Sequence, residues 1–268
     1  MVDYIYTIIL AVVEGITEFL PVSSTGHLIL VESLLNFGDD KAFTDAFIVI
    51  IQLPAIFSVC LYFWADLWPV KEGKLDGQIL MLWCKVIAAF VPAVVLGLLL
   101  DDWLETLFEN LTVALALIVG GIVIILVERR DHAGGTDSIH DLSFKQAIAI
   151  GFFQCLAMIP GTSRSGATIV GGLLLGTTRG VAAEFSFFLA IPTMVGATTY
   201  KVMKNGLDFS GHQWILISVG SVVSFVVAYG VVAFLMGYIK KHSFAAFGVY
   251  RIVLGVLVLI LLAKGVVT

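Results

Sequence analysis

The sequence predicts an all-α integral membrane protein with an inverted-topology repeat, in which each half holds one re-entrant helix hairpin and three transmembrane helices. Three observations support this fold class. Of the 268 residues, 59% are hydrophobic and only 13% are charged, whereas soluble domains are about half apolar and about a quarter charged. Six apolar runs are long enough to cross a bilayer, and two others are interrupted by polar turns. Similar residues also recur at a constant offset between the two halves of the chain.

Composition excludes several classes of protein. The mean hydropathy of +1.03 excludes a water-soluble enzyme, a secreted disulfide scaffold and a disordered protein. The net charge is −5 and the Lys and Arg residues are scattered, so the chain has no basic stripe that would bind nucleic acid. The three cysteines have neither the spacing of metal ligands nor that of a disulfide framework. We therefore expect residues 1–268 to form a single membrane domain without a nucleic-acid partner.

Long apolar runs predict the transmembrane helices. Crossing a bilayer takes roughly 20 predominantly apolar residues. Six runs meet this requirement, and in chain order they cover approximately residues 43–64, 79–100, 111–128, 181–201, 213–238 and 246–264.

Two other apolar stretches are predicted to be re-entrant helix hairpins. Residues 4–36 break at residues 21–26 (PVSSTG), and residues 144–177 break at residues 160–166 (PGTSRSG). The second arm of each stretch is too short to cross the membrane. Irregular backbone at membrane depth is tolerated only where it is buried in protein or lines a watery cavity. We therefore expect the two polar tips to meet inside the bundle.

The two halves of the chain, 1–130 and 131–268, resemble one another. A hairpin returns to its own side of the membrane and three spans do not, so the second half must be inverted relative to the first. An offset of 140 residues aligns Glu14 with Gln154, Ser23 with Ser163, Thr25 with Ser165 and Gly26 with Gly166, and an offset of 138 aligns Phe47 with Phe185 and Pro54 with Pro192.

The distribution of Lys and Arg between the loops predicts the orientation. With the N-terminus outside, eight of these residues fall on the cytoplasmic side and four on the outer side. We therefore expect both termini outside, with the first hairpin entering from the outer face and the second from the inner face. The eight are Lys71, Lys74, Arg129, Arg130, Lys145, Arg179, Lys240 and Lys241, and the four are Lys41, Lys201, Lys204 and Lys264.

Two carboxylates stand in the first arm of the first hairpin. Glu14 and Glu18 are four residues apart and therefore share one face of a helix. Carboxylates are costly inside a membrane and are usually kept there for function. The pair could bind a divalent cation through oxygen, or divide acid and base roles. The alternative is a water-exposed arm of the hairpin with no catalytic task.

Hydroxyl groups and an imidazole form the first tip. Ser23, Ser24 and Thr25 supply candidate nucleophiles, and His27 could act as their base or attack phosphorus itself. Imidazole is the best nucleophile of this group near neutral pH, which favours direct involvement of His27. By itself, however, a Ser-Ser-Thr-Gly segment is typical of a turn followed by a helix N-cap.

The second tip has the features of a phosphate-binding loop. Gly161 allows backbone N–H groups to approach an anion, and the helix that follows adds partial positive charge. Arg164 offers a planar fork suited to phosphate, and Ser163, Ser165 and Thr168 add donors. The loop lacks the Gly-Lys-Ser/Thr ending of nucleotide-hydrolysing P-loops. The alternative is a turn in which Arg164 only pairs with a carboxylate.

One more arginine lies inside the last apolar run. An unpaired cation is costly there, so Arg251 is either a second phosphate contact or a structural partner of a carboxylate. Together, the two tips place acidic, hydroxyl and imidazole groups opposite a phosphate-binding loop in the middle of a membrane. A phosphate at that depth belongs to a lipid or is in transit. A lipid phosphatase and a transporter or flippase therefore both fit these residues.

Two segments resemble the motifs of the undecaprenyl-diphosphatase family, also called the bacitracin-resistance protein family. Residues 14–30 (EGITEFLPVSSTGHLIL) are similar to its first motif region, and residues 160–168 (PGTSRSGAT) to its second. Length and hydropathy are similar over essentially the whole chain. The resemblance implies hydrolysis of undecaprenyl diphosphate to undecaprenyl phosphate and inorganic phosphate. This reaction recycles the lipid carrier for peptidoglycan synthesis and confers bacitracin resistance.

The resemblance also implies the make-up and location of the active site. It implies dependence on Mg²⁺ or Ca²⁺, which Glu14 and Glu18 would hold. It places the protein in the bacterial plasma (inner) membrane, among membrane lipids, with the active site open to the outer side. The choice of nucleophile among His27, Ser24 and water stays open, as does a homodimer. The residues assigned to the active site in this way are Glu14, Glu18, Ser24, His27, Ser163 and Arg164.

Overall fold

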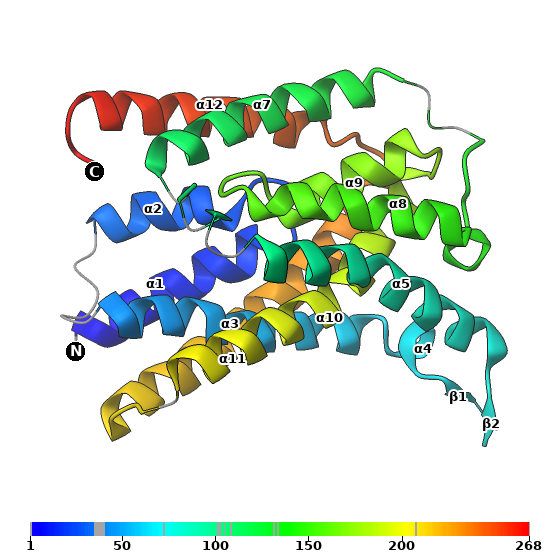
Figure 1. Ribbon diagram of the computed structural model, residues 1–268, viewed down its shortest axis with the longest axis horizontal. Helices are drawn as coiled ribbons and strands as arrows, with labels where there is room; N and C mark the ends of the chain where they lie inside the picture. Colours follow the sequence, from blue (N-terminus) through cyan, green and yellow to red (C-terminus); the bar gives the residue numbers. More distant parts are fainter. Residues whose placement is uncertain are drawn as a thin grey trace.

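The computed structural model describes residues 2–34, 41–71, 73–100, 103–104, 106–107, 109–130, 132, 134–206 and 208–267. In this part of the chain the regular structure is helical, apart from one short antiparallel pair of strands, β1 (Val70–Lys71) and β2 (Lys74–Leu75). The helices, shown in Figure 1, are α1 (Val2–Thr17), α2 (Ser24–Leu34), α3 (Lys41–Tyr62), α4 (Trp64–Leu67), α5 (Gly77–Leu99), α7 (Asn110–Glu128), η1 (Ile139–Asp141), α8 (Phe144–Cys155), η2 (Leu156–Met158), α9 (Arg164–Leu174), α10 (Arg179–Asn205), α11 (Gly211–Tyr238) and α12 (Ala245–Ala263).

Six helices are long and apolar enough to cross a membrane, which confirms the predicted multi-pass, all-α class. They are α3, α5, α7, α10, α11 and α12, and their ends agree with the predicted runs to within four residues. Three of them contain a proline, namely Pro54, Pro92 and Pro192. Proline is tolerated in transmembrane helices because neighbouring helices and side chains satisfy the backbone groups that it frees.

The outer faces of these helices are apolar. In water, such continuous apolar surface would cause aggregation, whereas in a bilayer it is the surface that contacts lipid. Side chains that are more than half exposed there include Phe57, Leu98, Val119, Val222 and Val253.

Two helical hairpins lie between the long helices. In Figure 1, α1 runs inward from the end of the molecule that holds both chain termini, and α2 returns to that end. The other hairpin, α8–α9, opens at the opposite end, where β1 and β2 also lie. The returning helices α2 and α9 have 11 residues each. At about 1.5 Å per residue they span roughly half of a hydrocarbon core that is about 30 Å thick.

Each hairpin packs on a long helix from the other half of the chain. Helix α1 lies against α11, and α8 lies against α5. Helices α3 and α10 contact each other between these pairs, and α7 and α12 run side by side (Figure 1). The α7–α12 contact is close because Gly121 and Gly248 face each other, and a Cβ on either would meet the carbonyl of the other at 2.5–2.7 Å.

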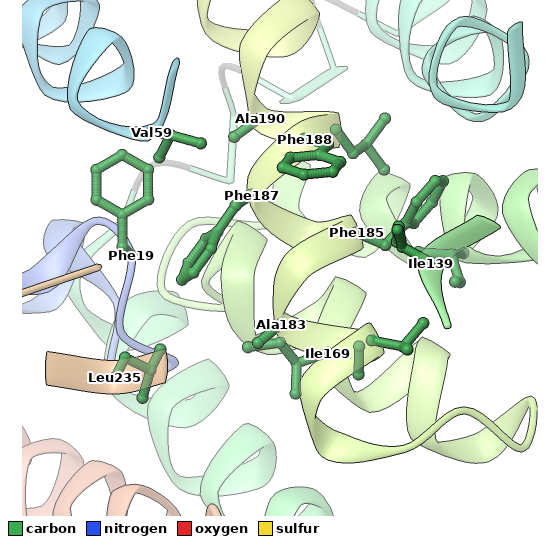
Figure 2. Close-up of a cluster of buried hydrophobic side chains, with 14 of the residues drawn as sticks. Phe19, Val59, Ile139, Ile169, Ala183, Phe185, Phe187, Phe188, Ala190 and Leu235 are labelled. Carbon is green, nitrogen blue, oxygen red and sulfur yellow. The ribbon is translucent and has the colours of Figure 1, made fainter. Parts of the chain in front are cut away.

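A cluster of buried aromatic side chains supports the turn that follows α1. Phe19 is fully buried and packs edge-to-face on Phe187 of α10, with ring centroids 5.6 Å apart (Figure 2). Val59 of α3 belongs to the same cluster. This packing holds the first tip against α10. The next residue after Phe19 along the tip, Leu20, then contributes a carbonyl to the site described below.

Candidate active site

The two hairpin tips are in direct contact, as the sequence predicts. Ser165 at the start of α9 donates a hydrogen bond to the carbonyl oxygen of Leu20 in the first tip, at 2.8 Å. Arg164 Nη2 lies 3.2 Å from Glu18 Oε1. This ion pair joins the second tip to the residue that directly follows α1. Residues 146 positions apart in the chain therefore meet in one polar cluster. The irregular backbone of both tips is enclosed by protein, since Pro21, Ser23, Pro160 and Gly161 are buried.

The two tips have the same local conformation. Ser23 and Ser163 are the only described residues other than glycine with a positive φ, at 72° and 71°. Each hydroxyl oxygen accepts a hydrogen bond from the N–H three residues later, that of Gly26 or Gly166. Both serines therefore act as helix N-caps. A positive φ is costly for a residue with a side chain, and such strain concentrates at functional sites.

Ser24, Glu18 and Arg164 form a connected group. The Ser24 hydroxyl donates to Glu18 Oε2 at 2.9 Å, while the other oxygen of this carboxylate accepts from Arg164. The Glu18 and Arg164 side chains are only 11% and 10% exposed. The carboxylate is therefore placed to receive the proton of the Ser24 hydroxyl, and the guanidinium lies beside the same carboxylate.

Helix α10 fixes the direction of the Arg164 side chain. Its Nη1 donates to the carbonyl oxygen of Ser186 at 2.8 Å, and its Cζ lies 5.9 Å from the centre of the Phe19 ring. The Thr168 hydroxyl donates a hydrogen bond to the Ser186 hydroxyl at 2.7 Å, which is a second contact between α9 and Ser186 of α10. Arg164 Nε is buried and has no protein partner among the described residues. Of the five N–H donors of the guanidinium, two make the hydrogen bonds to Ser186 and Glu18, and the Nε–H is one of those left for a ligand.

Glu14 lies one helical turn before Glu18 and is fully buried. Neither of its carboxylate oxygens accepts a hydrogen bond from a described residue. Glu18, Gln52 and Arg164 are the groups close enough to act on its charge. A buried carboxylate without a partner is unstable unless a proton or a cation compensates it. The two oxygens, together with the neighbouring Glu18, form a donor set that suits a hard divalent cation.

Most of the other predicted phosphate donors of the second tip bond to protein. Ser163 and Ser165 hydroxyls lie 3.1 Å apart, and Thr168 is fully buried against the Arg164 carbonyl and Ser186. Gly161 has a φ of 89° and packs on α7. In the first tip, Thr25 is half-buried on the first turn of α2. These residues shape the tips, whereas Ser24, Glu18, Glu14 and Arg164 offer the reactive groups.

Arg251 is buried among backbone carbonyl groups. Its five N–H donors reach five of them, with distances from 2.8 to 3.5 Å. These contacts agree with the predicted role of Arg251 as a structural partner, although its partners are backbone carbonyl groups and not a carboxylate. They do not include the other predicted role, a phosphate contact. Gly120 makes room for the guanidinium, because a Cβ there would lie 2.8 Å from Cζ. The five acceptors are Pro21 in the first tip, Gly161 and Thr162 in the second, and Ala116 and Leu117 in α7.

His27 lies one helical turn beyond Ser23 and faces α12. Its Nδ1 is 2.7 Å from the Ser23 carbonyl oxygen, and its Nε2 is 2.7 Å from the Tyr250 hydroxyl. Both ring nitrogens are therefore engaged with protein groups. Among the hydrogen bonds of the described residues, Glu18 rather than His27 is the partner of Ser24.

Sequence reasoning did not identify Ser186 or Tyr250 as parts of the site. A hydroxyl inside an apolar span is a weak signal, and the contribution of Ser186 to Arg164 comes from its carbonyl, which every residue has. Tyr250 is next to Arg251, but nothing in the sequence distinguishes it from the other six tyrosines. Among the described residues no group of three or more His, Cys, Asp or Glu side chains gathers as a metal site.

Comparison with known families gives a match over most of the chain. Residues 7–257 match the family described as bacitracin resistance protein BacA.

Curated proteins from several bacteria are similar over nearly their whole length. A protein of Fusobacterium nucleatum named undecaprenyl-diphosphatase is 52% identical over 264 residues, which cover 95% of this chain and 99% of that protein. Undecaprenyl-diphosphatase 1 of Clostridioides difficile is 49% identical, with 97% and 96% covered. A protein of Enterococcus faecalis with the name undecaprenyl-diphosphatase is 45% identical, with 98% of both chains covered.

Proposed function

Because the chain belongs to the bacitracin resistance protein BacA family, we propose that it is an undecaprenyl-diphosphatase. It hydrolyses undecaprenyl diphosphate to undecaprenyl phosphate and inorganic phosphate, and so recycles the lipid carrier for cell-wall synthesis. The name shared by its relatives supports this activity. The observation that carries the proposal is the group formed by Ser24, Glu18 and Arg164 where the two tips meet.

The same group suggests how the diphosphate binds. The Nε–H of Arg164 has no partner among the described residues, and Arg164 is the first residue of α9, while Ser24 is the first residue of α2. The N-termini of both helices therefore lie at the site, and their partial positive charge attracts the diphosphate anion. Arg164 stabilises the charge that develops on the transferring phosphoryl group. The apolar faces of the surrounding spans leave the prenyl tail in contact with apolar side chains and lipid.

Ser24 is the nucleophile in this mechanism. Its oxygen attacks the terminal phosphorus while Glu18 takes its proton, and the bond from that phosphorus to the bridging oxygen breaks. Undecaprenyl phosphate leaves and takes the proton from Glu18. Water then attacks the seryl phosphate as Glu18 accepts a proton from it. Inorganic phosphate departs, and Glu18 returns the proton to the Ser24 oxygen.

A divalent cation fits beside this group. Glu14 and Glu18 would hold Mg²⁺ or Ca²⁺, because the oxygens of Glu14 are buried without partners. Such cations bind through one or two carboxylates together with phosphate oxygens of the substrate. When bound, the cation would neutralise negative charge on the diphosphate.

We also propose that the two halves, 1–130 and 131–268, form an inverted repeat whose hairpins are re-entrant. The matching φ angles of Ser23 and Ser163 support this relation. The packing supports it as well, since α1 lies on α11 of the second half and α8 lies on α5 of the first. The two hairpins open at opposite ends of the molecule in Figure 1. By the loop charges, the termini and the open end of α1–α2 face outside the plasma membrane, and substrate enters from that side.

Phosphate release in detergent tests the activity. Purified protein with undecaprenyl diphosphate and Mg²⁺ should release inorganic phosphate although no membrane separates two compartments. A transporter or flippase would bind the lipid and release none. Lack of phosphate release by folded wild-type protein would therefore refute the phosphatase and favour the transporter class.

A further inference from the structure

We propose that Tyr250 of α12 positions His27, and through it the backbone of Ser24, for the hydrolysis described above. This inference rests on the proposed function. Among the contacts of the described residues, Tyr250 touches neither Ser24 nor Arg164, so its role is to position His27. His27 in turn supports the backbone and is not the nucleophile.

The hydrogen bonds define which nitrogen of His27 carries the proton. A carbonyl oxygen only accepts, so Nδ1, at 2.7 Å from the Ser23 carbonyl, carries the hydrogen. In the neutral ring Nε2 is then the acceptor, and the Tyr250 hydroxyl at 2.7 Å donates to it. The Ser23 carbonyl therefore selects the tautomer of the imidazole, and the Tyr250 hydroxyl donates to the nitrogen that this tautomer leaves as the acceptor.

The relative orientation of the two rings agrees with this hydrogen bond. The His27 and Tyr250 rings are nearly parallel, with an interplanar angle of 9° and centroids 5.5 Å apart. With Nε2 and the hydroxyl oxygen 2.7 Å apart, the rings meet edge to edge, and the hydroxyl lies close to the plane of the imidazole, where the Nε2 lone pair points. The lone pair of Nε2, which a nucleophilic histidine would need, points at the Tyr250 hydroxyl.

The other end of this chain of contacts is the peptide group before Ser24. His27 Nδ1 holds the carbonyl of Ser23, and Ser23 has the strained φ of 72°. Rotation of that peptide would move Ser24 away from Glu18, which accepts its hydroxyl proton at 2.9 Å. Strained backbone persists only where the surroundings hold it. Tyr250, His27 and the Ser23 carbonyl are the contacts that supply this support from α12.

Tyr250→Phe is the discriminating variant, because it keeps the aromatic ring and removes only the hydroxyl. We expect kcat to fall about 2- to 10-fold, the effect of one hydrogen bond between uncharged groups, with KM for the lipid diphosphate little changed. Tyr238→Phe is the matched control. Its ring stacks on a histidine, His242, which contacts the main-chain oxygen of Tyr238. This control should retain wild-type kcat.

Nitrogen NMR of ¹⁵N-histidine-labelled protein tests the contact without any assay of activity. The His27 signals, assigned by their loss in His27→Gln, should show the Nδ1–H tautomer with a hydrogen-bonded Nε2. In Tyr250→Phe the Nε2 signal should move downfield as it loses its donor, while Tyr238→Phe leaves it unchanged. An Nε2 signal that is the same in wild type and Tyr250→Phe overturns the inference, and so does an unchanged kcat. If wild-type protein released no phosphate, the proposed function would fail while the NMR result still decided the contact.

Discussion

At the scale of single residues, the polar groups of the candidate site differ in whether their hydrogen-bond donors and acceptors have protein partners. Among the described residues, Arg164 Nε and the two carboxylate oxygens of Glu14 have no hydrogen-bond partner. Arg251 and His27, in contrast, use their donors and acceptors on protein atoms. Groups that remain unpaired in a buried site are the ones available to a ligand.

Arg164→Lys should be nearly inactive although the positive charge is retained. A lysine ammonium cannot contact Glu18, the Ser186 carbonyl and a phosphate in the geometry of the planar fork. Loss of such a transition-state contact costs about 10²–10³-fold in kcat. Arg130→Lys, at an exposed position, is the control. Near wild-type phosphate release by purified Arg164→Lys would leave Arg164 as a structural ion-pair partner only.

Ser24→Ala should abolish both turnover and a covalent phosphoenzyme. The reason is that Ser24 is the hydroxyl hydrogen-bonded to Glu18, whereas both nitrogens of His27 are engaged elsewhere. Single-turnover reactions with terminally labelled substrate, quenched in acid, should trap a seryl phosphate on wild type. In a parallel sample quenched in base, a labelled histidine, stable in base and labile in acid, would instead identify His27 as the nucleophile.

Glu14→Gln should act through the metal ion. The amide keeps the shape of the side chain but loses the anion that a hard cation prefers. We expect the Mg²⁺ or Ca²⁺ concentration needed for half-maximal activity to rise at least about tenfold, since an uncompensated charge contact is worth about 1.4 kcal/mol or more. The measurement is a metal titration of phosphate release. Full activity of the wild type in excess chelator would remove the metal from the proposal.

At the scale of elements, α12 holds the two hairpin tips in place. Non-helical tips expose carbonyl groups at a depth where water is scarce, and each unsatisfied one costs free energy. Arg251 contacts carbonyls in both tips and in α7 at once, so a single side chain joins the two tips and α7 to α12. The tips are therefore coupled to a long helix that contributes no reactive group.

Gly120→Ala and Arg251→Lys should both lower thermal stability and activity. The alanine Cβ would lie against the Arg251 guanidinium, and lysine has three donors for the five carbonyls that arginine reaches. Each carbonyl left unsatisfied costs about 1–3 kcal/mol. Gly230→Ala, on α11 where a Cβ meets open space, is the matched control and should be neutral. Melting temperature and phosphate release in detergent give the comparison. Equal behaviour of Gly120→Ala and Gly230→Ala would show that the Arg251 contacts are dispensable.

At the scale of the whole molecule, the arrangement has two distinct ends. Both chain termini and the open end of α1–α2 lie at one end, and the β1–β2 turn and the open end of α8–α9 lie at the other (Figure 1). The Lys and Arg residues of the loops concentrate at the second end by the predicted topology, including Lys71 and Lys74. By the positive-inside rule, this distribution supports the proposed orientation with the termini outside.

Protease accessibility in spheroplasts tests this orientation. A cleavable epitope after the C-terminus should be removed by added protease, because it lies on the outer side. The same epitope inserted in the turn at Gly73, where no neighbouring atom is close, should be protected until the membrane is lysed. The reverse pattern would contradict the orientation and would place the substrate entrance on the cytoplasmic side.

The features that could be predicted from the sequence are those with a local cause. The six spans follow from runs of apolar residues, and the tips follow from Pro, Gly and Ser clusters that interrupt shorter runs. The meeting of the two tips also follows, because two polar tips within a bundle have only each other and its interior as surroundings.

Other features depend on contacts between distant parts of the chain and could not be predicted in this way. Arg251 reaches Pro21 and Gly161, and Tyr250 reaches His27, and the partners of these contacts are 90 to 230 residues apart in the sequence. Which donor meets which acceptor depends on the path of the backbone, including the positive φ of Ser23. That path is set by packing of whole helices, since a residue's own preferences disfavour it. The types of reactive group are therefore encoded locally, whereas their pairing is a property of the folded bundle.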